Sequence, residues 1–183
     1  MSFTSPLSKR FVDMFEARGY TSITAGTLDG REDISCLRAK DASTPDSVIL
    51  VFFEVLKFNV RDAEECINID ETEADRVIIV YSAGITCFAR RIIDNALKFK
   101  MEYFPAKELE SNIIKHEFQP RKFIKLKPHE SVEFKKRWGE KFPKMLSVDK
   151  IARYYNFVQG DIIEIHRRNG DVVYRIVINP VQK

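Results

Sequence analysis

The stretch Val48-Ile49-Leu50-Val51-Phe52-Phe53 is an unbroken apolar run in which β-branched and aromatic residues predominate. Apolar residues without alternation are typical of a strand that is buried on both faces. A second run, Val77-Ile78-Ile79-Val80-Tyr81, has the same character, and Met101 to Phe104 is a third candidate strand. The sequence therefore predicts a small sheet that is covered by helices on both sides.

Helical segments separate these strands. Ser5-Pro6 is a good helix start and Gly19 a good stop. Further helices are expected over 62–75, after Gly84 and over 105–109. The helix after Gly84 is expected to bury one apolar stripe, made of Phe88, Ile92, Ile93, Ala96 and Leu97. Residues 27–47 are polar, with turn signals at Asp29-Gly30 and Thr44-Pro45-Asp46.

The charge of the chain changes sign near residue 111. The 183 residues carry a net charge of +3. Residues 1–111 have 14 Lys and Arg against 19 Asp and Glu, a net of −5, whereas residues 112–183 have 16 against 8, a net of +8. Such a shift predicts two modules, an α/β module over 1–111 and a second one over 112–183.

The second module reads as an α+β domain. Pro128 begins a helix with apolar Val132, Phe134 and Trp138, which Gly139 ends. Ser147 can cap a further helix over 148–155. Strands are expected over 161–167 and 172–178, joined across Asn169-Gly170, which is a strong hairpin signal.

Signals of enzyme chemistry are largely missing. The sequence has no phosphate-binding glycine loop, and the three histidines and three cysteines do not fall at metal-ligand spacing. We expect no catalytic residue, no metal and no cofactor. The longest apolar run is far shorter than a membrane span, the N-terminus lacks the features of a signal peptide, and the odd cysteine count fits a reducing compartment. The expectation is a soluble intracellular protein with no membrane partner.

One pattern is similar to the Pro-Asp…Asp/Glu-x-Lys signature of metal-dependent nucleases: Pro45-Asp46 followed by Glu54-Val55-Leu56-Lys57. That chemistry needs the Glu and Lys on one face of a strand. Glu54 and Lys57 are three residues apart, so strand alternation sends them to opposite faces unless a bulge at Val55 or Leu56 restores the pairing. A nuclease using Asp46, Glu54 and Lys57 stays an unfavoured alternative.

The second module has a specific order of motifs. They are Phe142-Pro143, 149–156 (Asp-Lys-Ile-Ala-Arg-Tyr-Tyr-Asn), 160–167 (Gly-Asp-Ile-Ile-Glu-Ile-His-Arg) and 174–177 (Tyr-Arg-Ile-Val), preceded by 116–120 (His-Glu-Phe-Gln-Pro). This order closely resembles the C-terminal domain of the shared fifth subunit of eukaryotic nuclear RNA polymerases. In archaea, the counterpart of that domain is a small polymerase subunit of its own.

The first module resembles the same family more weakly. Arg18-Gly19-Tyr20, Val51-Phe52-Phe53, 76–80 followed by Gly84-Ile85-Thr86, and Glu108-Leu109 before Asn112-Ile113 match in order. Only the eukaryotic and eukaryote-virus versions have this module, so the resemblance covers nearly the whole chain.

The sequence departs from the family at several positions. Lys150 replaces the Pro of an Asp-Pro, the loop between the last two strands shrinks to Arg168-Asn169-Gly170-Asp171, and the Gly-x-Thr-Pro-Ser-Ala turn appears as residues 84–89 without Pro and Ser. These departures indicate a diverged copy, either a cellular isoform or a viral homologue.

The resemblance implies a non-catalytic subunit of DNA-directed RNA polymerase. Residues 112–183 would be an assembly domain that docks on the largest subunit, and residues 1–111 a module of the lower jaw near downstream duplex DNA, which it would contact weakly and without sequence specificity. The location would be the nucleus, the nucleolus for a subunit of polymerase I alone, or the virion or viral factory for a viral homologue.

The resemblance also implies site residues. Thr86, Arg90 and Arg91 are expected near DNA, where a helix N-terminus and two cations can meet a phosphate. The expected subunit interface comprises His116, Pro120, Asp149, Arg153, Tyr154, Gly160, Asp161, Arg167, Tyr174 and Arg175. Apart from the nuclease, the remaining alternative is a free-standing nucleic-acid-binding module with steeply salt-dependent affinity.

Overall fold

The computed structural model describes residues 6–28, 31–41, 46–69, 74–98, 100–111, 113–139 and 141–180. The chain forms two compact units, Met1–Ser111 and Asn112–Lys183, which we call the N-terminal unit and the C-terminal unit. The expected turn signals at Asp29-Gly30 and Thr44-Pro45 lie outside the described residues.

The described part of the N-terminal unit contains a five-stranded mixed sheet in the order β1-β2-β3-β4-β5. The strands are β1 (Tyr20–Leu28), β2 (Arg31–Asp41), β3 (Ser47–Phe53), β4 (Arg76–Tyr81) and β5 (Lys100–Pro105). β1, β2 and β3 are antiparallel neighbours, whereas β3, β4 and β5 run parallel. The predictions of strands over 48–53, 77–81 and 101–104 are confirmed.

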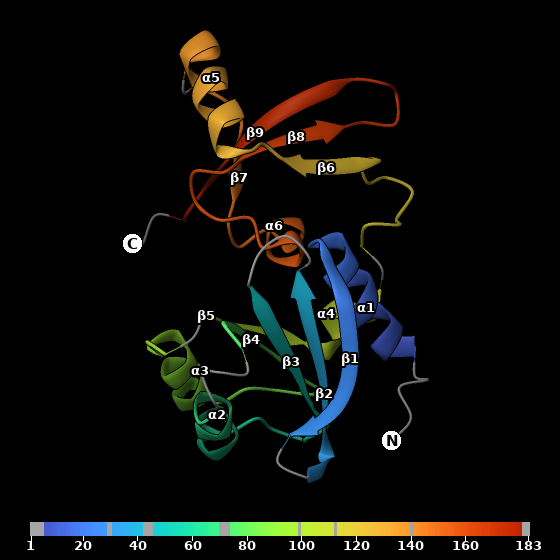
Figure 1. The fold of residues 1–183 in the computed structure, drawn as a ribbon, viewed down its shortest axis with the longest axis vertical. Helices are drawn as coiled ribbons and strands as arrows, with labels where there is room; N and C mark the ends of the chain where they lie inside the picture. The colour runs from blue at the N-terminus through green and yellow to red at the C-terminus, as the bar shows by residue number, and fades with distance from the viewer. Residues whose placement is uncertain are drawn as a thin grey trace. The chain divides into compact units, whose positions relative to one another are not determined.

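Four helices of this unit cover both faces of the sheet: α1 (Pro6–Ala17), α2 (Val60–Ile67), α3 (Cys87–Asp94) and α4 (Ala106–Glu110). Figure 1 shows α2 and α3 on one side of the sheet and α1 with α4 on the other. Ile49, Val51 and Phe53 pack toward α2 and α3, whereas the alternate residue Phe52 meets Phe11 of α1, with ring centroids 5.8 Å apart. Burial on both faces explains why β3 is apolar throughout.

Two helix predictions need correction. The helix expected over 62–75 is α2, which begins after Asn59 because the Asn59 side chain accepts from the Arg61 amide and Asp62 accepts from the Asn59 amide. The stripe expected on α3 is right only in part: Ile93 is buried and Ile92 packs against the core, as does Ala89, which was not expected in the stripe, but Phe88 is 68% exposed and Leu97 fully exposed. The helix ends at Asp94, so Leu97 never continues its helical spacing.

The C-terminal unit has a four-stranded sheet in the order β6-β8-β9-β7 among its described residues. The strands are β6 (Lys122–Lys125), β7 (Lys144–Leu146), β8 (Ile162–His166) and β9 (Val172–Ile178). The hairpin of β8 and β9 is confirmed, with Gly170 at a φ of +92° in its turn. β6 and β7 were not predicted, because strands of four and three residues are too short for a visible pattern.

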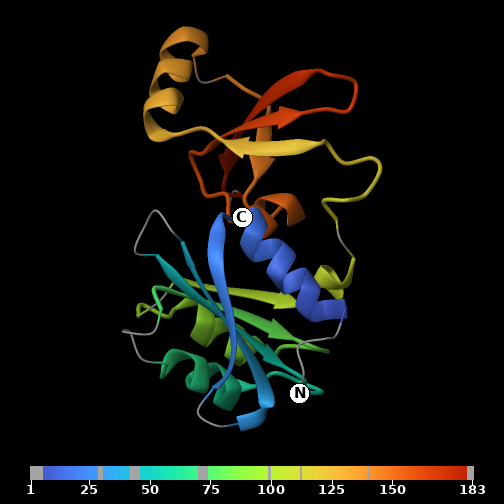
Figure 2. The same ribbon diagram turned by 45° about the vertical axis from the view of Figure 1, so that its right-hand side comes forward.

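Two helices flank this sheet. Figure 2 shows α5 (Pro128–Trp138) and α6 (Lys150–Tyr155) on opposite sides of it. α6 packs through Ile151 and Ala152 onto Ile163 and Ile165. Its cap is Asp149 and not Ser147 as expected: Asp149 Oδ1 accepts from the Ile151 amide, whereas Ser147 is held at the end of β7 by hydrogen bonds to Ile178 and Asn179.

The C-terminal unit is expected to fold without the rest of the chain. Its own core contains the fully buried side chains of Ala152, Ile163 and Val177. Residues 112–183, produced alone, should give a cooperative thermal transition in far-UV circular dichroism. A broad, non-cooperative melt would show that the unit needs the N-terminal residues for its stability.

Candidate partner-binding site

A half-open pocket of about 420 Å³ lies in the C-terminal unit, between the sheet and the start of α6. Its wall is mainly apolar and its charged groups come from four residues. The lining residues are Ile113, Gln119, Pro120, Phe123, Met145, Asp149, Lys150, Ile151, Ile165, Arg167, Val173 and Arg175. Four of the expected interface residues therefore share one surface: Pro120, Asp149, Arg167 and Arg175.

Strand register explains why these side chains meet. Phe123 of β6 is opposite Ile165 of β8, which is opposite Val173 of β9. Directly opposed residues point to the same face of a sheet, and so does a residue two positions along a strand. Arg175 therefore shares the face of Val173, and Arg167 follows two residues after Ile165. Apolar residues line the pocket, and the two arginines flank them.

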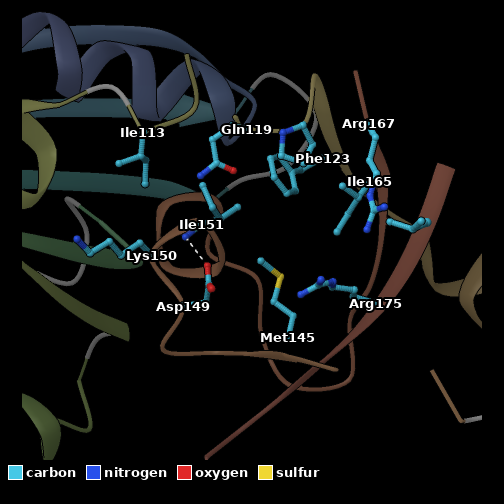
Figure 3. A pocket seen from close by; sticks show the side chains of 12 residues that line it. Ile113, Gln119, Phe123, Met145, Asp149, Lys150, Ile151, Ile165, Arg167 and Arg175 are labelled. Carbon is cyan, nitrogen blue, oxygen red and sulfur yellow. Dashed lines mark hydrogen bonds between the residues drawn. The ribbon is translucent and has the colours of Figure 1, made fainter. Parts of the chain in front are cut away.

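The charged groups of the pocket differ in whether they have a partner. Asp149 is occupied as the cap of α6, since its Oδ1 accepts from the Ile151 amide at 2.8 Å (Figure 3). Within the described part of the chain, no carboxylate pairs with Lys150, Arg167 or Arg175. Arg175 is nevertheless only partly exposed. A partly buried guanidinium favours a carboxylate partner, which it can bind in a bidentate manner. The pocket is thus suited to an acidic group that sits beside an apolar side chain.

Gly160 and Asp161 have structural roles next to this face. Gly160 has a φ of +92°, which confirms the prediction that its turn requires glycine, and its amide donates to the Val177 carbonyl at 2.9 Å. The Asp161 carboxylate accepts from the Val158 amide at 2.9 Å and pairs with Lys125 at 3.0 Å. Both residues fix the start of β8 and only indirectly shape the pocket.

Replacing Gly160 with valine is expected to destabilise the C-terminal unit by about 1–2 kcal/mol, because a β-branched residue is strained at a positive φ. Space is not the cause, since a Cβ at Gly160 would meet nothing within 4 Å. Gly84 has equally open space without a positive φ, so Gly84→Val is the matched control. Urea unfolding should show a larger loss of stability, relative to the wild type, in the C-terminal unit of Gly160→Val than in the N-terminal unit of Gly84→Val. Equal losses would contradict the argument.

Tyr174 lies on the opposite face of the sheet, away from the pocket. Its hydroxyl donates to Glu164 at 2.8 Å, and the second Glu164 oxygen is 2.5 Å from His166 Nε2. The hydrogen bond from Tyr174 lowers the pKa of the Glu164 carboxyl and raises the pKa of the phenol. The Tyr174 ring also packs on Phe134 of α5, with centroids 4.4 Å apart. This expected interface residue therefore holds α5 to the sheet.

The remaining expected interface residues are separate from the pocket lining. His116 is exposed, and its carbonyl accepts from the Arg168 guanidinium at 3.4 Å. Arg153 is partly buried on α6. Tyr154 is 6% exposed and meets Tyr155 edge-on, with centroids 5.6 Å apart, so it belongs to the packing of α6.

The three residues expected near DNA lie on α3 of the N-terminal unit. Thr86 is its cap, with Oγ1 accepting from the Ala89 amide at 3.2 Å. Arg90 and Arg91 are both exposed, and the Arg90 guanidinium lies over the Tyr103 ring at 5.9 Å from its centroid. Cation and ring attract each other, so the ring orients one of the two cations.

The nuclease residues do not converge. Asp46 precedes β3 and Glu54 follows it, so the strand holds them about 25 Å apart. The Asp46 carboxylate pairs with Arg76 at 3.3 Å, whereas Glu54 and Lys57 are exposed. In the described ranges no group of three or more His, Cys, Asp or Glu is placed to hold a metal ion. None of the helices described there is long and apolar enough to cross a membrane.

Several pocket residues were not foreseen from the sequence. Phe123 lies in the short strand β6, Met145 in the short strand β7 and Ile113 in a turn. None of these segments has a periodic pattern. The apolar residues within the Lys122-Phe123-Ile124-Lys125 segment are the single local signal. Only the paired register of β6, β8 and β9 brings them to one face.

Comparison with known proteins identifies the chain. Residues 111–177 match the family described as "RNA polymerase Rpb5, C-terminal domain". The chain is 30% identical to a putative DNA-directed RNA polymerase subunit 454R of Invertebrate iridescent virus 6, over 90% of this chain and 94% of that protein. It is 29% identical to the RPABC1 subunit of DNA-directed RNA polymerases I, II and III of Caenorhabditis elegans, over 81% and 74% of the two chains. The chain is also 30% identical to the rpabc1 subunit of Dictyostelium discoideum, over 81% of this chain and 80% of that protein.

The class is therefore that of non-catalytic subunits of DNA-directed RNA polymerase. Within that class, the chain belongs to the Rpb5 (RPABC1) family. The family resemblance noted in the sequence is confirmed, as is the fold class of an α/β unit followed by an α+β unit.

Proposed function

We propose that the C-terminal unit attaches this subunit to the largest subunit of the polymerase, through the pocket that Arg167 and Arg175 flank. The observation that carries this proposal is the partly exposed Arg175, which has no carboxylate partner in the described part of the chain and borders an apolar wall. A protein partner that inserts an apolar side chain and places a carboxylate on the guanidinium would complete both features.

The N-terminal unit then forms part of the lower jaw, near downstream duplex DNA. The net charge of −5 over residues 1–111 prevents this unit from binding phosphates over its whole surface. Contact is local and weak, at α3, where Arg90 and Arg91 are exposed; Arg91 lies in the last turn of this short helix and not at its start. The subunit acts in the nucleus, or in the virion or viral factory if it is encoded by a virus.

Affinity purification from the native source, followed by mass spectrometry, tests the docking. The tagged wild-type chain should recover the two large polymerase subunits. Arg175→Glu should reduce this recovery at least about tenfold. The new carboxylate would face the carboxylate that we propose for the partner, and like charges repel. Arg121→Glu is the control, since Arg121 is exposed and does not line the pocket. Undiminished recovery with Arg175→Glu would refute the docking surface.

Replacing Arg90 and Arg91 together with alanine should leave assembly intact and weaken the hold of the polymerase on downstream DNA. At most two phosphate contacts are lost, so the slope of log affinity against log salt should fall by about 2 at most. Sequence preference should not change, since phosphate contacts carry no base information. Dissociation of elongation complexes across a salt series measures this, and identical slopes would assign both arginines to solvent or to a protein partner.

A further inference from the structure

The end of α5 presents the only tryptophan of the chain to solvent. Trp138 is 62% exposed, and the Arg137 guanidinium lies over its ring at 5.2 Å from the centroid. Trp138 is the outermost member of an aromatic row, since Phe134 lies 6.5 Å from its centroid and only 4.4 Å from that of Tyr174 on the sheet. The row fixes the position of the exposed indole on a folded support.

Further cations are close to this indole along the chain. Lys135, Lys136 and Arg137 form the last turn of α5, and Lys141 precedes Phe142, which packs on Phe134 with centroids 5.1 Å apart. We call Trp138 and these four cations the Trp138 surface. Among the described residues, none of the four cations has an ion-pair partner. The segment 121–144 carries nine Lys and Arg against three Glu, so the surrounding potential is positive as well.

Ordinary helix chemistry does not account for the whole surface. Cations in the last turn of a helix complement its dipole, which explains Lys135, Lys136 and Arg137. The dipole does not explain Lys141 beyond the helix or an exposed tryptophan, which usually packs in a core or an interface. α5 has no buried residue, and its apolar Val132 and Trp138 are 54% and 62% exposed.

We infer that the Trp138 surface binds single-stranded nucleic acid, independently of the proposed function of the pocket and of α3. Bases stack on aromatic rings and phosphates pair with nearby Lys and Arg, and this combination needs no particular sequence. An acidic protein segment is the less favoured occupant, because lysine is depleted in protein–protein interfaces, whereas three of the four cations here are lysines.

The single tryptophan allows a direct test on the full chain. Addition of an oligothymidylate of about 20 nucleotides at low salt should quench the intrinsic tryptophan fluorescence, which comes from Trp138 alone. The affinity should fall as salt rises, with a log–log slope of about −0.7 for each phosphate contacted. A poly-glutamate peptide of equal charge should bind at least about tenfold more weakly. Equal binding of that peptide would overturn the proposal in favour of a protein partner.

Variants assign the binding to this surface, read by anisotropy of a labelled oligothymidylate. Trp138→Ala should weaken binding at least about fivefold and Trp138→Phe much less, because stacking needs a ring. Lys135→Glu with Arg137→Glu should weaken it at least about tenfold, because Lys135 is three residues before Trp138 on the helix and Arg137 lies over the ring. The matched control is Lys9→Glu with Arg61→Glu, an equal charge change at exposed positions of α1 and α2.

Thermal melts of all variants should match that of the wild type, because the substituted side chains lie at the surface. Arg90→Ala with Arg91→Ala should not alter the fluorescence quenching, which separates this surface from the proposed DNA contact on α3. The absence of quenching, or equal loss of affinity in the control and in the α5 variant, would overturn the proposal.

Discussion

Phe53→Ala is expected to lower the free energy of unfolding of the N-terminal unit by about 3–5 kcal/mol. Phe53 has no exposed surface and meets Phe58 edge-on, with ring centroids 4.9 Å apart. Its side chain lies at the centre of the core that α2 and α3 share with the sheet. Removal of the ring loses the transfer free energy and leaves a cavity in well-packed surroundings.

Phe88→Ala is the matched control, since Phe88 is 68% exposed and its loss should change stability by less than about 0.5 kcal/mol. Urea unfolding followed by circular dichroism measures both variants. Trp138 fluorescence reports the C-terminal unit in the same samples. A Phe53→Ala variant within about 1 kcal/mol of the wild type would show that this core collapses around the cavity.

The sequence predicted β3 and β4 because both strands are buried on two faces and therefore had to be apolar at every position. β1 was missed for the opposite reason. β1 is an edge strand of mainly Thr, Ser, Ala and Gly residues, and most of its described side chains are partly or fully exposed. Pairing with β2 holds it in place, and such pairing leaves little trace in the residue pattern.

Predictions about helices were wrong where two residues could take the same role. Ser147 and Asp149 can both cap a helix, but the pairing of β7 with β9 places Ser147 beside Ile178, so only Asp149 is free to cap α6. Phe88 was assigned to the buried stripe of α3 because its spacing is helical. The residues that face the sheet are Ala89 and Ile93, which the same spacing allows equally well.

The candidate site was foreseen only in part. Arg167 and Arg175 were expected at an interface from the family resemblance, and strand register places both at one pocket. Tyr174 was expected with them, but it neighbours Arg175 on a strand and therefore points to the other face. Of these two adjacent residues, Arg175 lines the pocket and Tyr174 packs against α5.

The ion pair of Arg18 and Glu102 is expected to be the strongest charged contact in the N-terminal unit. Arg18 follows α1 and Glu102 lies in β5, and both guanidinium nitrogens donate to the carboxylate, at 2.9 and 2.7 Å. The Arg18 side chain is 3% exposed and that of Glu102 is 20% exposed. Loss of one partner leaves the other charge desolvated without its bidentate partner, whereas loss of both removes the desolvation cost as well.

Glu102→Gln and Arg18→Met should each lower the free energy of unfolding by about 3 kcal/mol, within the range for a broken buried pair. The double variant Arg18→Met with Glu102→Leu should lose much less than the sum of the single changes, because no buried charge is left unmatched. The control is a pair with a single contact inside α1: Arg10 pairs with Asp13 at 3.2 Å through one guanidinium nitrogen, and the Arg10 side chain is 31% exposed against 3% for Arg18. Asp13→Asn should therefore cost less than Glu102→Gln. Urea unfolding of all the variants gives the coupling energy, and strictly additive losses would show that the pair contributes no more than two separate surface charges.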